Sequence, residues 1–312
     1  MSNTAFNSNY VSISGGSNPA TQQFRLTLAS NTPVMTTGVT AATTLYLTPY
    51  LGNNIGLYSS GAWSVVSSAE VNLSLAALSS ADTLYDIFAY LSGGNVLLEA
   101  LAWSNSGAGT SARATALTYQ DGILVKSGDA TRRYIGTIRT VLAGQTEFSF
   151  GGTSLDGTEA KLFVDNYYNK VRVKAFSGSS RAIWTYVASG QGSFRAAIGS
   201  NTMRVSFVQG VIESCVVADY VVSAQTTNTN TTAMCALGLN TVNASAGTLF
   251  CGSSTNSTLP VGVNAKCNAF PSVGFNYLSA LDGGNQATTF TFQNKDTNWG
   301  NEGAGLTFNG LF

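Results

Sequence analysis

The residues of this sequence that could do chemistry are its carboxylates and its cysteines, because the 312-residue chain contains no histidine. Without an imidazole, Ser-His-Asp and Cys-His catalysis and ordinary zinc sites with histidine ligands are excluded. No GxxxxGK[ST] segment occurs, and no GxGxxG lies between a strand and a helix, so nucleotide binding has no support. A pair of carboxylates, which is all that glycoside hydrolysis requires, is the remaining catalytic arrangement.

Two groups of acidic residues are close enough in sequence to form such a pair. They are Asp82 with Asp86, and Asp156 with Glu159 or Asp165. A chain with 15 acidic residues produces such neighbours without any function, and Asp is common in turns. We therefore predict surface or turn positions for these residues and no enzymatic activity. We also predict no cofactor and no metal ion, because no dense acidic cluster indicates a calcium site.

Four cysteines lie in the last third of the chain, at Cys215, Cys235, Cys251 and Cys267. The last three follow a C-x15-C-x15-C spacing, which does not match the closely spaced ligand pairs of zinc sites. Two interpretations stay open. One or two disulfides would suit a particle that must survive outside a cell, whereas free thiols would pack as small apolar groups.

Composition and periodicity indicate a folded protein made of strands. Hydrophobic residues make up 44% of the chain and charged residues only 10%. Short runs of alternating apolar and polar residues, beginning with Phe24–Leu28, recur about every 8–12 residues between Gly- and Asn-rich turns. Gly93-Gly94 suits a tight hairpin, so we predict strands at Tyr85–Leu91 and Val96–Trp103. The pattern predicts an all-β fold, an antiparallel β-sandwich or jelly-roll-like structure with a smaller β-rich C-terminal region.

The composition along the chain predicts four segments. Residues 1–22 are small and polar and are expected to form an extended N-terminal arm. Residues 23–222 form the sandwich or jelly-roll region, residues 223–232 a polar linker, and residues 233–312 a C-terminal β-rich domain. The N-terminus has neither a basic segment nor an apolar run, so we expect no secretory signal, and no apolar stretch is long enough to span a bilayer.

Two clusters near the C-terminus are candidates for contacts with other molecules. Phe308, Leu311 and Phe312 leave an apolar terminus, which either the chain's own core or a neighbouring subunit must cover. Trp299, with Asn298, Asn301 and Asp296 nearby, is the best candidate for a glycan or receptor contact, because aromatic rings with polar neighbours suit sugars. The alternative is that Trp299 caps the core of the terminal domain.

Charge is distributed unevenly although the net charge is zero. The segment from Arg113 to Arg204 carries a local net charge of +6, and the segments on either side carry −3 each. Basic residues alternate with apolar ones, as in Lys170-Val171-Arg172-Val173-Lys174, which is typical of the solvent face of a strand. A nucleic-acid footprint would be denser, so we predict no nucleic-acid partner and favour contact with an acidic partner surface.

Several segments together resemble a family of uncharacterised structural proteins from tailed bacteriophages. The resemblance covers about residues 22–222 and departs from the family pattern after Thr146-Glu147 and after Ser223. The segments that carry it are FRLTLASNTPVMTTGVTAATTLYLTPYLGNNIGLYSSGAW (24–63), RYIGTIRT (133–140), QTEF (145–148), KLFVDNYYNKV (161–171), WTY (184–186) and residues 203–218.

The resemblance implies a virion component, made in the host bacterial cytoplasm. We therefore predict a fibre or decoration protein attached to the tail or capsid as a homotrimer, with other virion proteins (capsid, portal or tail) as partners. Its N-terminal arm would be the virion anchor and would become ordered on binding. The alternative prediction is a host-receptor or glycan-binding module at a fibre tip.

Overall fold

The computed structural model describes residues 18–190, 192–227, 229–243, 248–293 and 304–312, and its described elements are strands apart from one short 3-10 turn, η1 (Ala197–Gly199). A three-stranded sheet and a two-stranded sheet come from the first 74 residues. The former has the order β1 (Phe24–Thr27), β3 (Thr44–Pro49), β6 (Val71–Ser74), and the latter pairs β4 (Asn54–Ser59) with β5 (Ala62–Ser67).

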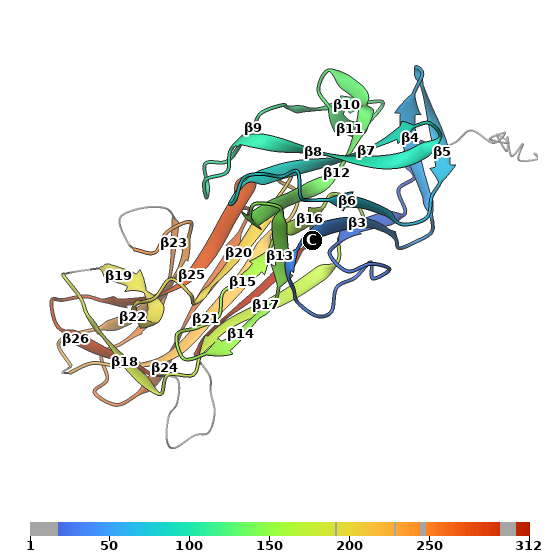
Figure 1. The fold of residues 1–312 in the computed structure, drawn as a ribbon. Coiled ribbons are helices and arrows are strands. Elements are labelled where there is room, and N and C mark those ends of the chain that lie inside the picture. Colours follow the sequence, from blue (N-terminus) through green and yellow to red (C-terminus); the bar gives the residue numbers. More distant parts are fainter. Residues whose placement is uncertain (1–17, 191, 228, 244–247, 294–303) are drawn as a thin grey trace, which may run out of the picture.

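A 15-stranded sheet runs through most of the molecule (Figure 1). Its main path is β23 (Thr248–Thr255), β22 (Ala233–Leu239), β25 (Gly274–Gly284), β20 (Arg204–Gln209), β15 (Ala160–Leu162), β13 (Gln145–Ser149), β12 (Asp129–Leu142), β7 (Leu84–Ser92), β8 (Asn95–Asn105) and β9 (Ala112–Arg113). The strands off this path are β2 (Val39–Ala42), β10 (Leu117–Gln120), β11 (Ile123–Lys126), β16 (Val164–Asn166) and β19 (Ser193–Ala196).

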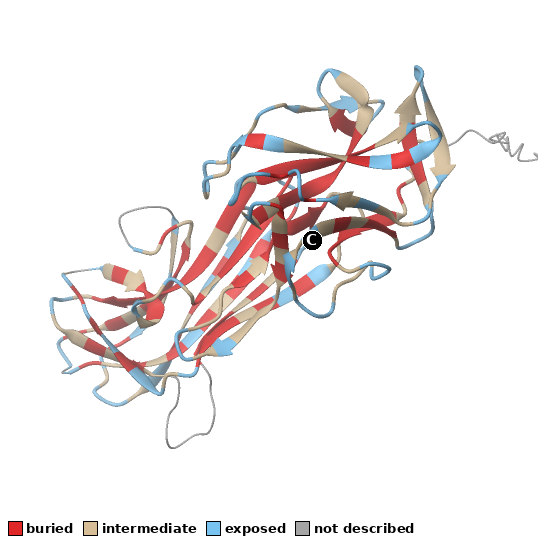
Figure 2. Ribbon diagram, viewed as in Figure 1, coloured by how far each residue is buried: buried red, intermediate tan, exposed pale blue. Residues whose placement is uncertain are grey.

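A seven-stranded sheet faces the C-terminal half of this large sheet. Its order is β14 (Gly151–Ser154), β17 (Arg172–Ser179), β27 (Gly305–Leu311), β21 (Val216–Gln225), β26 (Thr289–Gln293) and β18 (Ile183–Val187), with β24 (Val261–Ala269) on the other side of β21. Aromatic rings join the two layers: Phe207 of β20 lies 5.1 Å from Phe308 of β27, between ring centroids. Figure 2 shows buried residues along the strands of both layers. The predicted all-β sandwich is confirmed.

Two pairs of strands are parallel, so the sheets are not purely antiparallel as the sequence suggested. β14 pairs in parallel with β17, and β15 pairs in parallel with β20. The chain crosses between the layers here, because β13 and β15 belong to the large sheet whereas β14 belongs to the seven-stranded one. Strands that are adjacent in a sheet are then not consecutive in the chain. Because no hairpin joins them, they can pair in parallel.

The hairpin at Gly93-Gly94 lies where the sequence predicted it. β7 and β8 pair in antiparallel register from Tyr85–Ala102 to Ser92–Asn95. Gly93 and Gly94 both have positive φ angles, 57° and 81°, as the two central residues of a type I′ turn require. Glycine is the residue that adopts this conformation at the lowest cost, because it has no Cβ.

The predicted linker at 223–232 does not separate two domains. Residues 223–225 belong to β21, and the strands after it return to both sheets: β22 and β25 to the large sheet, β24, β26 and β27 to the smaller one. One hydrophobic core contains residues from both sides of the segment, such as Leu26 and Phe292. The described residues of the tract after β21 connect a strand of the seven-stranded sheet, β21, to a strand of the large sheet, β22.

Strand pairing explains the uneven charge of the sequence. Acidic residues of the N-terminal part form ion pairs with basic residues of the middle part that lie on other strands of the same large sheet. Arg113 Nε lies 2.6 Å from Asp86 Oδ2, and Glu99 accepts from both Lys126 Nζ (2.8 Å) and Arg132 Nε (2.6 Å). The local excess of positive charge is therefore partly neutralised within the fold.

A buried carboxylate, Asp282, connects the two layers at the end distant from β4 and β5. It accepts hydrogen bonds from Trp184 Nε1 (2.7 Å), Tyr220 Oη (3.0 Å) and the Ile198 amide (3.1 Å). No salt bridge to Asp282 occurs among the described residues. Burial raises the pKa of Asp282 to about 6, against the lowering effect of these hydrogen bonds and of the Arg195 charge.

This raised pKa predicts a loss of stability between about pH 4 and pH 6. Below pH 4 Asp282 is protonated in the folded and unfolded states, and its contribution is fully present. As the pH rises, only the unfolded chain releases the proton, so the free energy of unfolding falls by about 3 kcal/mol. Urea unfolding of the wild type and of Asp282→Asn across this range measures the difference. A difference that stays constant with pH would contradict the prediction.

Candidate functional site

The five carboxylates singled out in the sequence lie in ion pairs, and all but Asp165 pair with a residue at least 25 positions away in the chain. Asp82 pairs with Arg139 (2.9 Å), Glu159 with Arg204 (2.8 Å) and Asp156 with Arg181. Asp86 and Asp165 are both about 1% exposed and lie in strands β7 and β16, which corrects the prediction of surface or turn positions. Burial is tolerated because each has a basic partner, Arg113 and Lys170 respectively.

Asp86 and Asp165 belong to one buried polar network. Arg113 Nη2 donates to the Gly210 carbonyl oxygen (2.7 Å), and the Gly210 amide donates to Asp165 Oδ2 (2.6 Å). Thr137 Oγ1 donates to Asp86 Oδ1 (2.7 Å). Burial raises the pKa of both carboxyls, opposed by the hydrogen bonds and charge of their basic partners. The network holds the strands together inside the fold and does not line any of the described surface hollows.

A second buried cation, Arg133, holds the base of the N-terminal arm. Its side chain is fully buried, and Nη1 lies 2.8, 2.9 and 2.7 Å from the carbonyl oxygens of Pro19, Thr21 and Gly56. Its guanidinium carbon lies 4.6 Å from the centre of the Tyr168 ring. Burial lowers the pKa of Arg133, against the effect of Tyr168. We call this arrangement the Arg133 clamp.

The predicted C-terminal candidates fall into two groups. Trp299, Asn298, Asn301 and Asp296 lie outside the described residues. Phe308 and Phe312 are buried in the chain's own core, where their rings lie 5.1 and 6.4 Å from that of Phe207. Leu311 points to the other face of β27 and is 42% exposed. Of the predicted apolar terminus, Leu311 alone is available to another molecule.

All four cysteines are free thiols in this structure. Cys235 and Cys267 are buried, and burial raises the pKa of each to about 12. Cys215 and Cys251 are exposed. Cys235 and Cys267 therefore match the second interpretation of the sequence, in which free thiols pack as small apolar groups.

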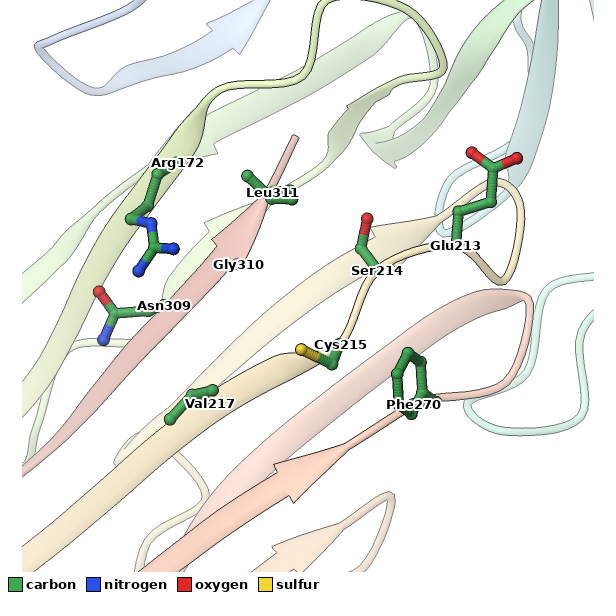
Figure 3. Close-up of a pocket in the computed structure, with 9 residues that line it drawn as sticks. All are labelled: Arg172, Glu213, Ser214, Cys215, Val217, Phe270, Asn309, Gly310 and Leu311. Carbon is green, nitrogen blue, oxygen red and sulfur yellow. The ribbon is translucent and has the colours of Figure 1, made fainter.

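A surface groove lies on the outer side of the seven-stranded sheet, at the ends of β17, β21 and β27 (Figure 3). Its volume is about 410 Å³. Strand register brings the lining together, because Arg172 of β17 is opposite Leu311 of β27, and Asn309 of β27 is opposite Val217 of β21. Gly310 of β27 also contributes, and the remaining lining comes from the segment before β21 (Glu213, Ser214 and Cys215) and from Phe270, which follows β24.

The groove combines exposed apolar side chains with a positive charge. Phe270 is 68% exposed and Val217 46%, which is unusual for large apolar residues on the face of a sheet. Arg172 forms no salt bridge with any described residue, and neither does Lys174, which lies two residues along the same strand face. Figure 3 shows Glu213 on the opposite side of the groove from Arg172. Glu213 interacts with Tyr167. Burial raises the pKa of the Tyr167 hydroxyl, and the nearby Glu213 raises it further.

Phe270 also borders a second hollow. This hollow has a volume of about 460 Å³, and polar uncharged side chains contribute much of its lining, including Thr110, Asn240, Thr248 and Ser272. The aromatic side chain therefore stands between two depressions and lines both. We call the two depressions together the Phe270 groove.

Sequence reasoning missed Phe270, because a single aromatic residue before a proline has no periodic signal. The alternation around Arg172 and Lys174 did predict their exposure on a strand face. The described residues contain no group of three or more Cys, Asp or Glu residues that could hold a metal ion. None of the described helical residues forms a helix long and apolar enough to cross a membrane.

Comparison with known proteins adds little to this geometry. No family model matches the chain, and no curated protein matches it significantly. Among solved structures, one described as the structure of infectious bursal disease virus, Gx strain, is similar over 95% of this chain and 79% of that chain. The identity is 10% and the TM-score is 0.28, so this likeness carries no argument about function.

Proposed function

We propose that this protein is a structural component of a tailed-bacteriophage virion, a fibre or decoration subunit attached to the tail or capsid through its N-terminal arm. The Arg133 clamp carries the proposal. Arg133, Gly56 and Tyr168 come from three of the segments that resemble tailed-phage structural proteins, and they meet at one point. The residues that hold the base of the arm therefore belong to the segments that resemble tailed-phage structural proteins.

The clamp suits an anchor because it holds main-chain atoms. Arg133 bonds the carbonyl oxygens of Pro19 and Thr21, and the Gly56 amide donates to Thr21 as well (2.8 Å). Gln22 adds an isolated bridge to Ile55. A segment that is fastened through its backbone keeps its position whatever its side chains do, so the described chain begins, at Asn18, beside a fixed part of the body.

A homotrimer is the assembly that we propose for this subunit. β18 is at the edge of the seven-stranded sheet, and its outward side chains Ile183 and Val187 are 57% and 67% exposed. Exposed edges with β-branched residues favour pairing with another chain, and natural proteins usually cover them. β18 pairs with β26 on one side, so a second copy on its other side would cover both the open edge and the exposed side chains.

Deletion of residues 1–17 tests the anchor. By light scattering we expect three chains per particle in both proteins, which is about three times 32.4 kDa for the full chain, and we expect the truncated protein to be absent from purified virions by immunoblotting. The deletion stops before Asn18 because Pro19, Ala20 and Thr21 belong to the Arg133 clamp. Incorporation at the full-length level would contradict the anchor, and a monomer in both proteins would contradict the trimer.

Binding of a host-surface receptor or glycan is the second candidate function, and the Phe270 groove favours it. The groove presents an exposed aromatic ring beside polar side chains, which is the combination that sugar-binding surfaces use. It is compatible with the first function, because a fibre subunit can carry both an anchor and a binding surface.

A further inference from the structure

We infer that the Phe270 groove binds an acidic glycan, a saccharide chain with carboxylate groups. The inference rests on the second of the two proposed functions and names its ligand class. Three observations carry it: the aromatic side chain that borders two hollows, the unpaired basic residues at one end, and the polar uncharged lining at the other.

The aromatic side chain is the first element. Phe270 is 68% exposed and lines both hollows, so a ligand can contact the ring from either depression. Pyranose rings have an apolar face of C–H groups that packs on an aromatic ring. Val217 and Leu311 extend this apolar surface within the first hollow.

The positive charge at one end of the Phe270 groove favours a negatively charged ligand. Arg172 and Lys174 lie on the outer face of β17 and form no salt bridge with any described residue, whereas the buried Arg113 and Lys170 are paired with acids. Figure 3 shows the Arg172 guanidinium and the Asn309 side chain next to each other at the edge of the groove. A guanidinium binds a carboxylate through two parallel hydrogen bonds, and an amide can add a third.

The second hollow extends the site along a chain molecule. Thr110 and Thr248 offer hydroxyl groups, which suit the hydroxyls of a neutral sugar, and Ser272 Oγ, which donates to Asn276 Oδ1 (3.1 Å), can accept a further hydrogen bond. Among the described residues that line the two hollows, Glu213 is the only acidic one, and it is engaged by Tyr167 on the side opposite Arg172. A long acyl chain would leave these polar groups without partners, so the lining favours a saccharide over a lipid.

A glycan array with the full-length protein tests the inference. The array carries oligogalacturonates and sialylated and pyruvylated oligosaccharides as acidic probes, and maltose and mannose oligomers as neutral ones. We expect binding to carboxylated glycans and at least tenfold weaker binding to neutral glycans of the same length. The absence of binding to every carboxylated glycan would overturn the inference and would leave the virion-anchor test unaffected.

Four variants test whether the glycan binds in the Phe270 groove. Phe270→Ala and Arg172→Gln should each weaken binding to the best acidic probe about tenfold, measured by calorimetry. Leu259→Ala and Lys266→Gln are the matched controls, because these side chains are 72% exposed and 73% exposed, respectively, and lie outside the groove. Unchanged affinity in Phe270→Ala or Arg172→Gln would overturn the site. A change in solution mass in these two variants, with glycan affinity kept, would assign the groove to subunit contact instead.

Discussion

Arg133→Met is expected to lower the free energy of unfolding by about 3–5 kcal/mol, because it removes the guanidinium donor from the carbonyl oxygens of Pro19, Thr21 and Gly56, of which Thr21 alone keeps the Gly56 amide. Arg133 is fully buried and has no carboxylate partner among the described residues, so its hydrogen bonds to Pro19, Thr21 and Gly56 are what compensate its burial. Methionine has a similar length and keeps most of the packing on Tyr168. Urea unfolding measures the loss.

The adjacent residue provides a matched control. Arg132 pairs with Glu99 at the surface, with about a quarter of its side chain exposed, so Arg132→Met should cost about 1 kcal/mol or less. Hydrogen exchange separates the two variants further. The amides of Gln23 and Gly56 bond across the base of the arm, to Asn54 and Thr21, and should exchange faster in Arg133→Met alone. Equal losses of stability in the two variants would refute the special role of the clamp.

Asp86→Ala is expected to have a comparably large effect, a loss of about 3–5 kcal/mol. Removal of this carboxylate leaves the Arg113 guanidinium largely buried, with the Gly210 carbonyl as its remaining polar partner. It also removes the acceptor of the Thr137 hydroxyl. Thermal and urea unfolding of the variant, compared with Asp129→Ala, measures the effect. Asp129 is a partly exposed partner of Arg132 at 3.8 Å, and its loss should cost about 1 kcal/mol or less.

A double variant tests whether the uncompensated charge is the cause. Asp86→Leu with Arg113→Leu removes both charges, so it should be more stable than the sum of the two single losses predicts. Simple additivity of the two losses would show that packing, and not the ion pair, dominates at this site.

Much of the strand content follows from short-range patterns in the sequence. Alternation from Phe24 to Leu28 and the glycine pair at Gly93-Gly94 depend on residues within a few positions of one another, and the structure has β1 and the β7–β8 hairpin there. The exposure of Arg172 and Lys174 follows from the same period of two. Local backbone preference and solvent exposure therefore sufficed for these elements.

Pairing between distant strands did not follow from such patterns. The polar tract at 223–232 has the composition of a linker, yet the strands after it return to both sheets and share one core with β1. Aspartate is common in turns and at surfaces, yet Asp86 and Asp165 are both buried, because Arg113 reaches Asp86 from another strand and Lys170 folds back onto Asp165.

The sequence by itself therefore determined the class of fold, the exclusion of histidine chemistry, and the alternation that puts basic side chains on a strand face. Tertiary structure alone decided which charges meet, that Phe308 and Phe312 face inward while Leu311 faces outward, and that Phe270 stands between two hollows. The physical reason is the range of the interactions. Strand periodicity depends on neighbours in the chain, whereas ion pairs, clamps and grooves depend on segments that sheet register brings together from distant parts of the sequence.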